Sequence, residues 1–197
     1  MLRLTIALIL VLLGGGTALW WGTEGGQAFT AETARRLDIA KHPRPLPPTA
    51  LADSSGATLS LDQYHGGPLV LEFIYASCPD ICVALGTAFE QLDAAAPGGT
   101  HLLSVSFDPE DDARSLGAFA DRHGATAPRW RVAAVPDSAA RSRLLEHAGV
   151  VVIPDGMGGF VHNAGLYVVD PTGHLIAVFD PDDTKAALSM LDRLAQR

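Results

Sequence analysis

The two cysteines of this chain, Cys78 and Cys82, lie where a strand pattern changes into a helix pattern. The apolar run 68–75 predicts a buried strand, and Pro79 suits the first turn of the helix that follows, because that turn does not need its missing N–H. Residues four apart at a helix start project from the same face, so the two thiols can form a disulfide or bind one metal ion together. The helix N-terminus favours a thiolate at Cys78, whereas the carboxylate of Asp80 opposes it.

An uncharged, apolar segment at residues 4–22 indicates a membrane helix near the N-terminus. At ~1.5 Å per residue it covers roughly the ~30 Å hydrocarbon core of a bilayer. Arg3 precedes the segment and Trp20 and Trp21 close it, which is typical of a positively charged cytoplasmic flank and an interfacial aromatic anchor. We therefore expect residues 1–23 to be a single-pass anchor in the cytoplasmic membrane, with the rest of the chain facing the periplasm. A cleaved signal sequence is the alternative.

The remainder of the chain has the composition of one globular domain behind a short linker. Of the 197 residues 48% are hydrophobic, and the net charge is −8 with no basic cluster, which argues against nucleic acid as a partner. Prolines and glycines are frequent in residues 24–48, which we interpret as a linker, and residues 49–197 form the domain. Outside the cytoplasm, two neighbouring cysteines can exist as a disulfide.

The pattern of the domain predicts a thioredoxin-like α/β sandwich. A buried strand leads into the cysteine helix, strand and helix then alternate, and a hairpin and a last helix close the fold. An N-terminal hairpin and an insertion before the C-terminal hairpin are additions to this order. The predicted elements are a hairpin over 51–61, strands over 68–75, 101–107 and 131–135, helices over 78–96, 110–123 and 137–149, a hairpin over 165–179 and a helix over 182–196.

His162 is the third residue that can carry chemistry. Glycines on both sides predict a loop just ahead of the second hairpin. A histidine in a loop is more often exposed or hydrogen-bonded than a ligand, so the cysteine pair carries most of the argument. A closed zinc site needs four ligands, whereas two thiolates and one imidazole suit copper, either as Cu(I) or, with an added oxygen ligand, as Cu(II). For the cysteines alone, a structural disulfide is the competing interpretation.

Three ordered motifs resemble the SCO/SenC proteins over roughly residues 45–180. They are Tyr75-Ala76-Ser77-Cys78-Pro79-Asp80-Ile81-Cys82, Ser104-Val105-Ser106-Phe107-Asp108-Pro109-Glu110-Asp111-Asp112, and His162 ahead of Tyr167-Val168-Val169-Asp170-Pro171-Thr172-Gly173. The resemblance implies a membrane-anchored, thioredoxin-like protein that binds copper through Cys78, Cys82 and His162. It also implies a role in assembling the binuclear copper site of cytochrome c oxidase, and in thiol-disulfide exchange. The chain departs from the family pattern at Ala76 and Val83, neither of which is an expected ligand.

Two functions remain open at this point. The first is a copper metallochaperone whose partner is the copper-bearing subunit of cytochrome c oxidase or another periplasmic copper acceptor. The second is an enzyme, a periplasmic thiol-disulfide oxidoreductase in which Cys78 attacks and Cys82 resolves, without an obligatory metal. His162 favours the first, because disulfide exchange needs no distant imidazole. The CxxxC spacing favours it too, since general oxidoreductases use CxxC.

Four further residues near the motifs have simpler interpretations than metal binding. Asp108 and Asp112 suit a turn and a helix cap, and Asp80 suits a solvated acid in the first helical turn. Met157 precedes His162 by five residues and could transfer copper, but a methionine in a loop is more often a packing residue.

Overall fold

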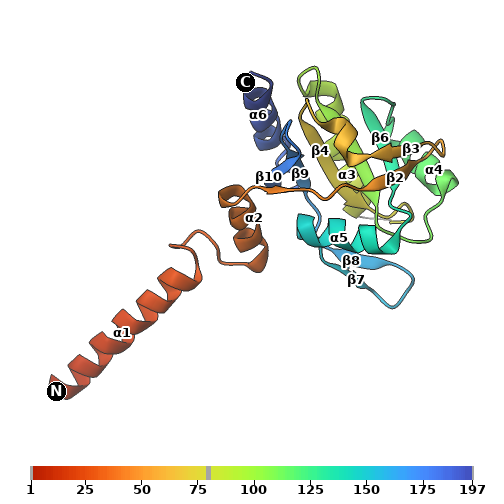
Figure 1. Ribbon diagram of the computed structural model, residues 1–197. Helices are drawn as coiled ribbons and strands as arrows, with labels where there is room; N and C mark the ends of the chain where they lie inside the picture. Colours follow the sequence, from red (N-terminus) through yellow and green to blue (C-terminus); the bar gives the residue numbers. More distant parts are fainter. Residues whose placement is uncertain (1, 79–80, 197) are drawn as a thin grey trace.

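The computed structural model describes residues 2–78 and 81–196, apart from the side chains of residues 81–83, and shows one sheet with helices on both faces (Figure 1). The main sheet has eight strands in the order β1-β10-β9-β4-β5-β6-β2-β3. These strands are β1 (Arg44–Pro45), β2 (Ala50–Asp53), β3 (Thr58–Ser60), β4 (Leu69–Ile74), β5 (His101–Ser106), β6 (Trp130–Ala134), β9 (Leu166–Val169) and β10 (His174–Phe179). A separate antiparallel pair consists of β7 (Val152–Pro154) and β8 (Phe160–His162).

The centre of the main sheet is the parallel pair β4 and β5. Their pairing runs in register from Leu69 opposite His101 to Ile74 opposite Ser106. Every residue of β4 is buried, because helices cover both faces of the sheet at this strand. β6 extends the parallel part on one side, and β9 pairs antiparallel with β4 on the other. The buried strand predicted over 68–75 is therefore confirmed.

Helices cover the two faces unequally. On one face α3 (Ile81–Ala95) contacts α4 (Ala113–His123) and α6 (Thr184–Ala195). Phe89 of α3 packs on Trp130 of β6 there, with ring centroids 5.6 Å apart. On the other face lie α2 (Ala31–Lys41) and α5 (Ser138–Ala148), and the guanidinium of Arg35 in α2 lies 5.5 Å from the ring of Tyr167 in β9. The predicted order of strands and helices is confirmed.

Acidic caps and glycines set the ends of these helices. Asp112, Asp137 and Asp183 cap α4, α5 and α6 by accepting hydrogen bonds from backbone N–H groups of the first turn. Gly124 and Gly149 end α4 and α5 in the left-handed conformation, with φ of 70° and 69°. Both helices end within one residue of the bounds predicted from the sequence, at His123 and Ala148.

Three polar side chains form a hydrogen-bonded chain across the buried strands on the α3 side. Ser104 of β5 bonds to the carboxyl group of Glu72 in β4 and accepts a bond from Nε1 of Trp130 in β6 at 2.9 Å. Burial raises the pKa of Glu72 to about 8, although the bond to Ser104 opposes the rise. The carboxyl group is therefore largely neutral at physiological pH, which removes the cost of burying an unpaired charge.

Residues 24–48, interpreted above as a linker, contain the helix α2 and the strand β1. Thr30 caps α2 by accepting from the N–H of Thr33 at 3.1 Å, and Ile39 is fully buried against the domain. The helix packs on β10 (Figure 1). The prolines and glycines of this region flank eleven residues that contain neither, so the average composition concealed a helix.

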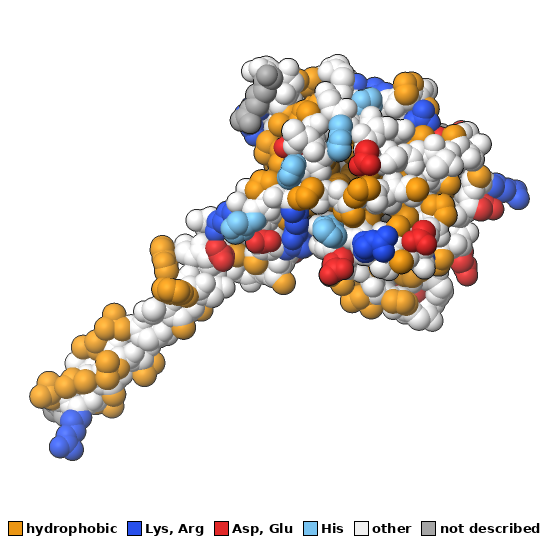
Figure 2. Space-filling view, in the orientation of Figure 1, with side chains coloured by type: hydrophobic (Ala, Val, Ile, Leu, Met, Phe, Trp, Pro, Cys, Tyr) orange, Lys and Arg blue, Asp and Glu red, His pale blue; other side chains and the backbone are white. Residues whose placement is uncertain are grey.

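The N-terminal helix α1 (Leu2–Gly22) is, within the described residues, the one helix long and apolar enough to cross a membrane. None of its residues is buried, and Figure 1 shows it extending away from the domain. Figure 2 shows hydrophobic side chains along its length. By length and composition α1 is a candidate membrane anchor, and a signal sequence has the same two properties.

The contact of α2 with the domain should weaken in acid. Burial alone raises the pKa of Glu32, but hydrogen bonds from Arg35, Arg36 and Asn163 outweigh it and lower the pKa from 4.5 to about 2. Because the folded state resists protonation of this group, its contribution to stability is complete above about pH 4.5 and is lost as the pH falls towards about 2.

We predict that Glu32→Gln lowers the unfolding temperature of the full chain at about pH 6 by roughly 2–4 °C, which corresponds to about 1 kcal/mol for a partly exposed network. Thermal unfolding of both proteins across the acid range provides the measurement. The difference between them should shrink steadily as the pH falls below the ordinary pKa of a glutamate. A difference of constant size over that range would contradict the prediction.

Candidate metal centre

Cys78 lies at the edge of the sheet where the parallel strands β4 and β5 end. It follows β4 after a turn in which its backbone N–H donates to the carbonyl of Tyr75 at 3.1 Å, and it is only 4% exposed. The backbone N–H of Phe107, just past β5, donates to the carbonyl of Ile74 at 3.0 Å. The carboxyl ends of parallel strands are the usual place for ligand sites in α/β proteins, so Cys78 occupies a favourable position for binding.

The carboxylate of Asp111 holds the backbone just before Cys78. Its Oδ2 accepts hydrogen bonds from the backbone N–H of Ala76 at 2.8 Å and from Oγ of Ser106 at 2.5 Å. Its Oδ1 accepts a bond from Oγ of Ser115 in α4 at 3.0 Å. The bond from Ala76 joins the loop after β5 to the turn after β4, while the other two bonds anchor Asp111 to β5 and α4. Together they fix the position of Cys78 relative to β5.

His162 reaches the same edge of the sheet from β8. The predicted loop is wrong for this residue, because His162 pairs with Val152 at one end of the β7–β8 hairpin. Of the glycines that suggested a loop, Gly158 and Gly159 belong to the hairpin turn, whereas Gly165 lies between β8 and β9. Gly156 and Gly158 of that turn adopt φ of 76° and 94°. Such positive φ values favour glycine, so the glycines mark the turn between two strands rather than an irregular segment.

Aromatic rings hold the hairpin against the turn that carries Cys78. The ring of Phe107 contacts the imidazole of His162 edge to face, with centroids 5.0 Å apart. Phe160 packs on Phe107 at 5.5 Å and on Tyr75 at 5.3 Å, and the Tyr75 hydroxyl donates to the Phe160 carbonyl at 3.3 Å. The imidazole is thus held by side chains from both strand ends.

Neither ring nitrogen of His162 has a hydrogen-bond partner among the described residues, although both nitrogens are buried. Burial lowers the pKa of His162 to about 4, so the ring is neutral at physiological pH. A neutral imidazole offers a nitrogen lone pair, which is the form that binds metal ions. A buried nitrogen without a partner is rare in folded proteins, and a metal ion would supply one. The chemistry of His162 therefore fits a metal ligand.

An open pocket of about 590 Å³ has both Cys78 and His162 in its wall. The residues that line it are Tyr75, Ser77, Cys78, Asp155, Met157, Gly158, Gly159, Phe160, Val161 and His162. Asp155 shapes the rim, because its Oδ1 accepts from the N–H groups of Met157 at 2.7 Å and Gly159 at 2.9 Å, and these bonds lower its pKa. Met157 is 88% exposed at this rim, so its side chain does not pack in the core.

Cys82 lies in the first turn of α3, which begins at Ile81. Its side chain lies outside the described residues, as do Pro79 and Asp80. The disulfide between the cysteines and the complete set of three copper ligands therefore stay predictions. Among the side chains that the structure describes, no group of three or more His, Cys, Asp or Glu residues could hold a metal ion. Of the three predicted ligands, Cys78 and His162 have described side chains and Cys82 does not.

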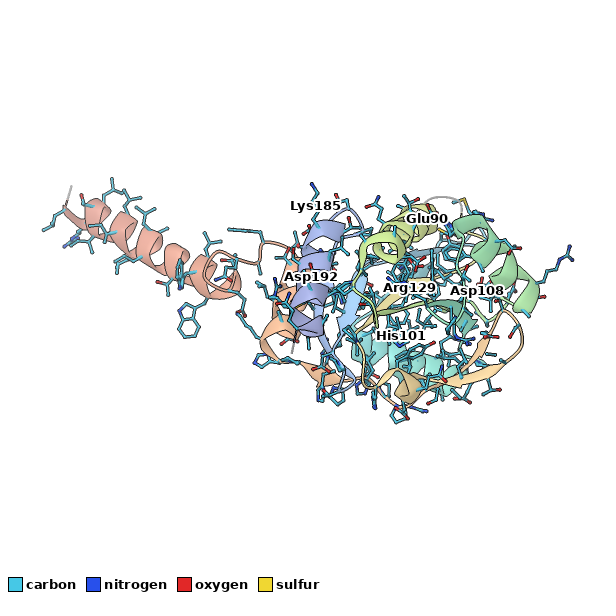
Figure 3. The ribbon with its side chains drawn as sticks, turned by 90° about the horizontal axis from the view of Figure 1, so that it is seen from above. Glu90, His101, Asp108, Arg129, Lys185 and Asp192 are labelled. Carbon is cyan, nitrogen blue, oxygen red and sulfur yellow. The ribbon has the colours of Figure 1, made fainter. Side chains whose placement is uncertain are left out.

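Asp108 and Asp112 serve the loop and the helix that follow β5, and neither lines the pocket of Cys78. Asp112 accepts bonds at 3.0 and 2.8 Å from two backbone N–H groups of α4, and Asp108 accepts one at 2.9 Å from the N–H two residues later. Their interpretation as cap and turn is confirmed. Figure 3 shows Asp108 beside α4, across the domain from Lys185 and Asp192 of α6.

Sequence reasoning missed Asp111 and Asn163. Asp111 stands in the same acidic run as Asp108 and Asp112, and only the folded chain selects the one that reaches Ala76. Asn163 follows His162 directly, and its side chain bonds to three partners described below. A polar amide next to the expected ligand was the available signal, but it could not identify partners from distant segments.

A family model described as SCO1/SenC matches residues 41–196, which is most of the chain. The chain belongs to the SCO1/SenC family. The match includes Cys78, Cys82 and His162, and it confirms the resemblance found in the three motifs.

Individual members of the SCO1/SenC family are similar to this chain over most of its length. The SCO1 protein homolog of Bacillus subtilis (strain 168) is 23% identical over 138 residues, which cover 66% of this chain and 70% of the relative. The copper-bound structure of Bradyrhizobium japonicum ScoI has a TM-score of 0.62 at 22% identity, over 77% of this chain and 99% of that chain. BsSco, a Sco-family cytochrome c oxidase assembly protein with a disulfide switch, has a TM-score of 0.67 at 17% identity, over 79% and 96%. These similarities confirm the thioredoxin-like fold.

We predict that Asp111→Ala lowers the free energy of unfolding by about 2 kcal/mol, because three donors lose a charged acceptor. The amide of Ala76 should also exchange its hydrogen faster, which mass spectrometry of the full chain can detect. Asp108→Ala is the matched control, since it removes one turn contact at the other end of the loop and should cost no more than about 1 kcal/mol. If both variants lose the same free energy of unfolding, and the amide of Ala76 exchanges its hydrogen at the wild-type rate, Asp111 does not hold the turn.

Proposed function

We propose that this member of the SCO1/SenC family is a copper metallochaperone that binds the ion through Cys78, Cys82 and His162. It delivers copper to the binuclear copper site of cytochrome c oxidase, or prepares the thiols of that site. The observation that carries the proposal is that one pocket is lined by Cys78 and by a neutral His162, whose ring nitrogens have no hydrogen-bond partner among the described residues. Cys82 follows Cys78 by four residues and lies in the adjacent helix. Sco proteins bind copper and take part in cytochrome c oxidase assembly, which supports the assignment.

The three proposed ligands suit both oxidation states of copper. Two thiolates are soft ligands that favour Cu(I), while the imidazole of His162 contributes more to Cu(II), the harder ion. The pocket opens to solvent at the rim that carries Met157, so ligands of an acceptor can approach the ion before Cys78 and Cys82 release it. Transfer by exchange of one ligand at a time fits such an open site.

In the proposed function, the helix α1 holds the copper-binding domain beside a membrane. We take α1 as a single-pass anchor in the cytoplasmic membrane with the copper-binding domain in the periplasm. The flanking Arg3 and the paired Trp20 and Trp21 support that orientation. An acceptor in the copper-bearing subunit of a membrane-bound oxidase would then meet the pocket at the membrane surface, and no diffusible carrier would be needed.

A second candidate function is thiol-disulfide exchange with the same two cysteines. The disulfide switch identified in BsSco favours it. In this reaction the Cys78 thiolate attacks an acceptor disulfide, and Cys82 then displaces the acceptor's second sulfur. The two cysteines end as one disulfide, while the acceptor gains two electrons and two protons and leaves as a dithiol. Since a reduced acceptor can then bind metal, this reaction prepares the partner for copper.

Copper titration of single variants tests the proposal. We predict that His162→Ala weakens retention of Cu(II) by more than roughly 100-fold, which exceeds the loss typical of groups that only support a ligand. Retention of Cu(I) should change much less, because the two thiolates remain. Cys78→Ser and Cys82→Ser should each abolish tight binding of both ions. The measurement is competition with chelators for the reduced full chain in detergent, with absorption spectra to detect a thiolate-to-Cu(II) band.

The control for this titration is His147→Ala, because His147 is an exposed histidine on α5 outside the pocket. It should bind copper like the wild type. If His162→Ala binds Cu(I) and Cu(II) with wild-type affinity, and the protein reduces disulfides through its cysteines, the metallochaperone proposal fails. The oxidoreductase function then takes its place.

A further inference from the structure

The side-chain amide of Asn163 ties together both ends of the hairpin that carries His162. Its Oδ1 accepts from the backbone N–H of Val151, just before β7, at 2.7 Å. Its Nδ2 donates to the carbonyl of Gly149 at 3.0 Å and to Oε2 of Glu32 at 3.2 Å. Asn163 comes immediately after His162, so a contact made by Asn163 directly restrains the ligand end of β8.

The Glu32 end of this contact belongs to α2, and Arg35 reinforces it from the same helix. Arg35 donates two hydrogen bonds to Glu32, at 2.9 and 2.5 Å, and one to the carbonyl of Ala148 in α5 at 3.1 Å. Its guanidinium also lies over the ring of Tyr167, whose hydroxyl donates to the carbonyl of Asn163 at 3.2 Å. Two residues of α2 thus hold the entrance and the exit of the hairpin.

The hairpin needs such support, because each of its strands has only three residues and the pair is not joined to the main sheet. A two-stranded hairpin alone is at most marginally stable in water. The aromatic contacts of Phe107 and Tyr75 secure its pocket side, while Val151, Ile153 and Val161 are each more than half exposed. The bonds of Asn163 to Gly149, Val151 and Glu32 add further fixed points at the ends of the hairpin.

We propose that α2 is a brace in which Glu32, through Asn163, positions His162 relative to Cys78. The inference rests on the proposed function, since it takes His162 as a copper ligand. The proposed brace lies almost wholly outside the part of the chain that the SCO1/SenC family model matches. That match begins at residue 41 and includes only the last residue of α2. In this arrangement the segment that leads from α1 to the domain also sets the geometry of the copper pocket.

The ion pair of Arg36 in α2 with Asp180 of the domain provides a control. Arg36 contacts Asp180, which follows β10, at 2.5 Å, and its Nε also donates to Glu32 at 2.7 Å. Within the described residues, the Arg36–Asp180 pair makes no hydrogen bond to Asn163 or to the β7–β8 hairpin. Asp180→Asn therefore loosens the attachment of α2 without removing the link to His162. Glu32→Ala removes that link, and Glu32→Gln keeps an oxygen that can accept from Asn163.

The experiment compares these three variants and the wild type as full chains in detergent. Hydrogen exchange of the metal-free proteins, read at Val151 and over residues 152–162, measures the order of the hairpin without copper. In Glu32→Ala this exchange should accelerate, and Cu(II) retention should fall by roughly 10–100-fold, as is typical when a group that orients a ligand is removed. The Cu(II) absorption spectrum should shift as well. Glu32→Gln and Asp180→Asn should keep the wild-type spectrum, and exchange over the hairpin should change much less in them than in Glu32→Ala.

Each outcome decides the proposal. If Glu32→Ala matches Asp180→Asn in exchange and in Cu(II) retention, α2 only adds stability and the brace is wrong. Faster exchange with unchanged Cu(II) retention also overturns it, because the hairpin would then move without affecting the ligand. Should Glu32→Ala fail to fold, Asn163→Ala removes the same link from the other side and must give the same two changes. If His162→Ala binds copper like the wild type, the proposed function fails, and so does the brace as a device for positioning a copper ligand.

Discussion

The parallel pairing of β4 with β5 is the constraint on which the candidate site depends. Both strands are almost wholly buried and run in the same direction, so the segments that follow them leave the sheet side by side. One segment carries Cys78, and the other carries Phe107 and Asp111. Asp111 then fixes the turn of Cys78, while Phe107 provides the surface on which His162 packs. One pair of strands thereby places both the thiol and the support for the imidazole.

The predictable parts of the molecule were those that a local pattern specifies. The buried run of β4, the cap at Asp137 and the glycine ends of helices follow from the chain immediately around them. The short strand that carries His162 could not be predicted in this way. Three residues are too few to show the alternation of apolar and polar side chains that marks a strand, and the pairing with its partner strand depends on tertiary contacts. The missed role of Asp111 has a similar cause, since the sequence offered several equivalent acids. Position within the family motif identified His162, but its lack of hydrogen-bond partners could be seen only in the folded chain.

The site combines a buried ligand with an open approach, which suits an ion that must be both held and released. His162 is neutral, and its ring nitrogens form no hydrogen bond within the described part of the chain. In the proposed function, neither a proton nor a bonded neighbour from that part needs to leave before copper binds. The hairpin that carries it is short, lies outside the main sheet and depends on contacts from Phe107 and from α2. A ligand on such an element can be displaced at little cost to the core, whereas Cys78 stays fixed beside the central strands. In the proposed function, the cysteine side therefore retains the ion and the histidine side releases it first.

X-ray absorption at the copper edge of the loaded full chain tests the central claim most directly, because it counts the atoms bound to the ion. We expect two sulfur ligands and the multiple scattering of one imidazole in the Cu(II) protein, with the imidazole signal absent from His162→Ala. The sulfur signal should persist in that variant. A copper shell with only nitrogen and oxygen ligands, or an imidazole signal that survives the loss of His162, would contradict a site built from Cys78, Cys82 and His162.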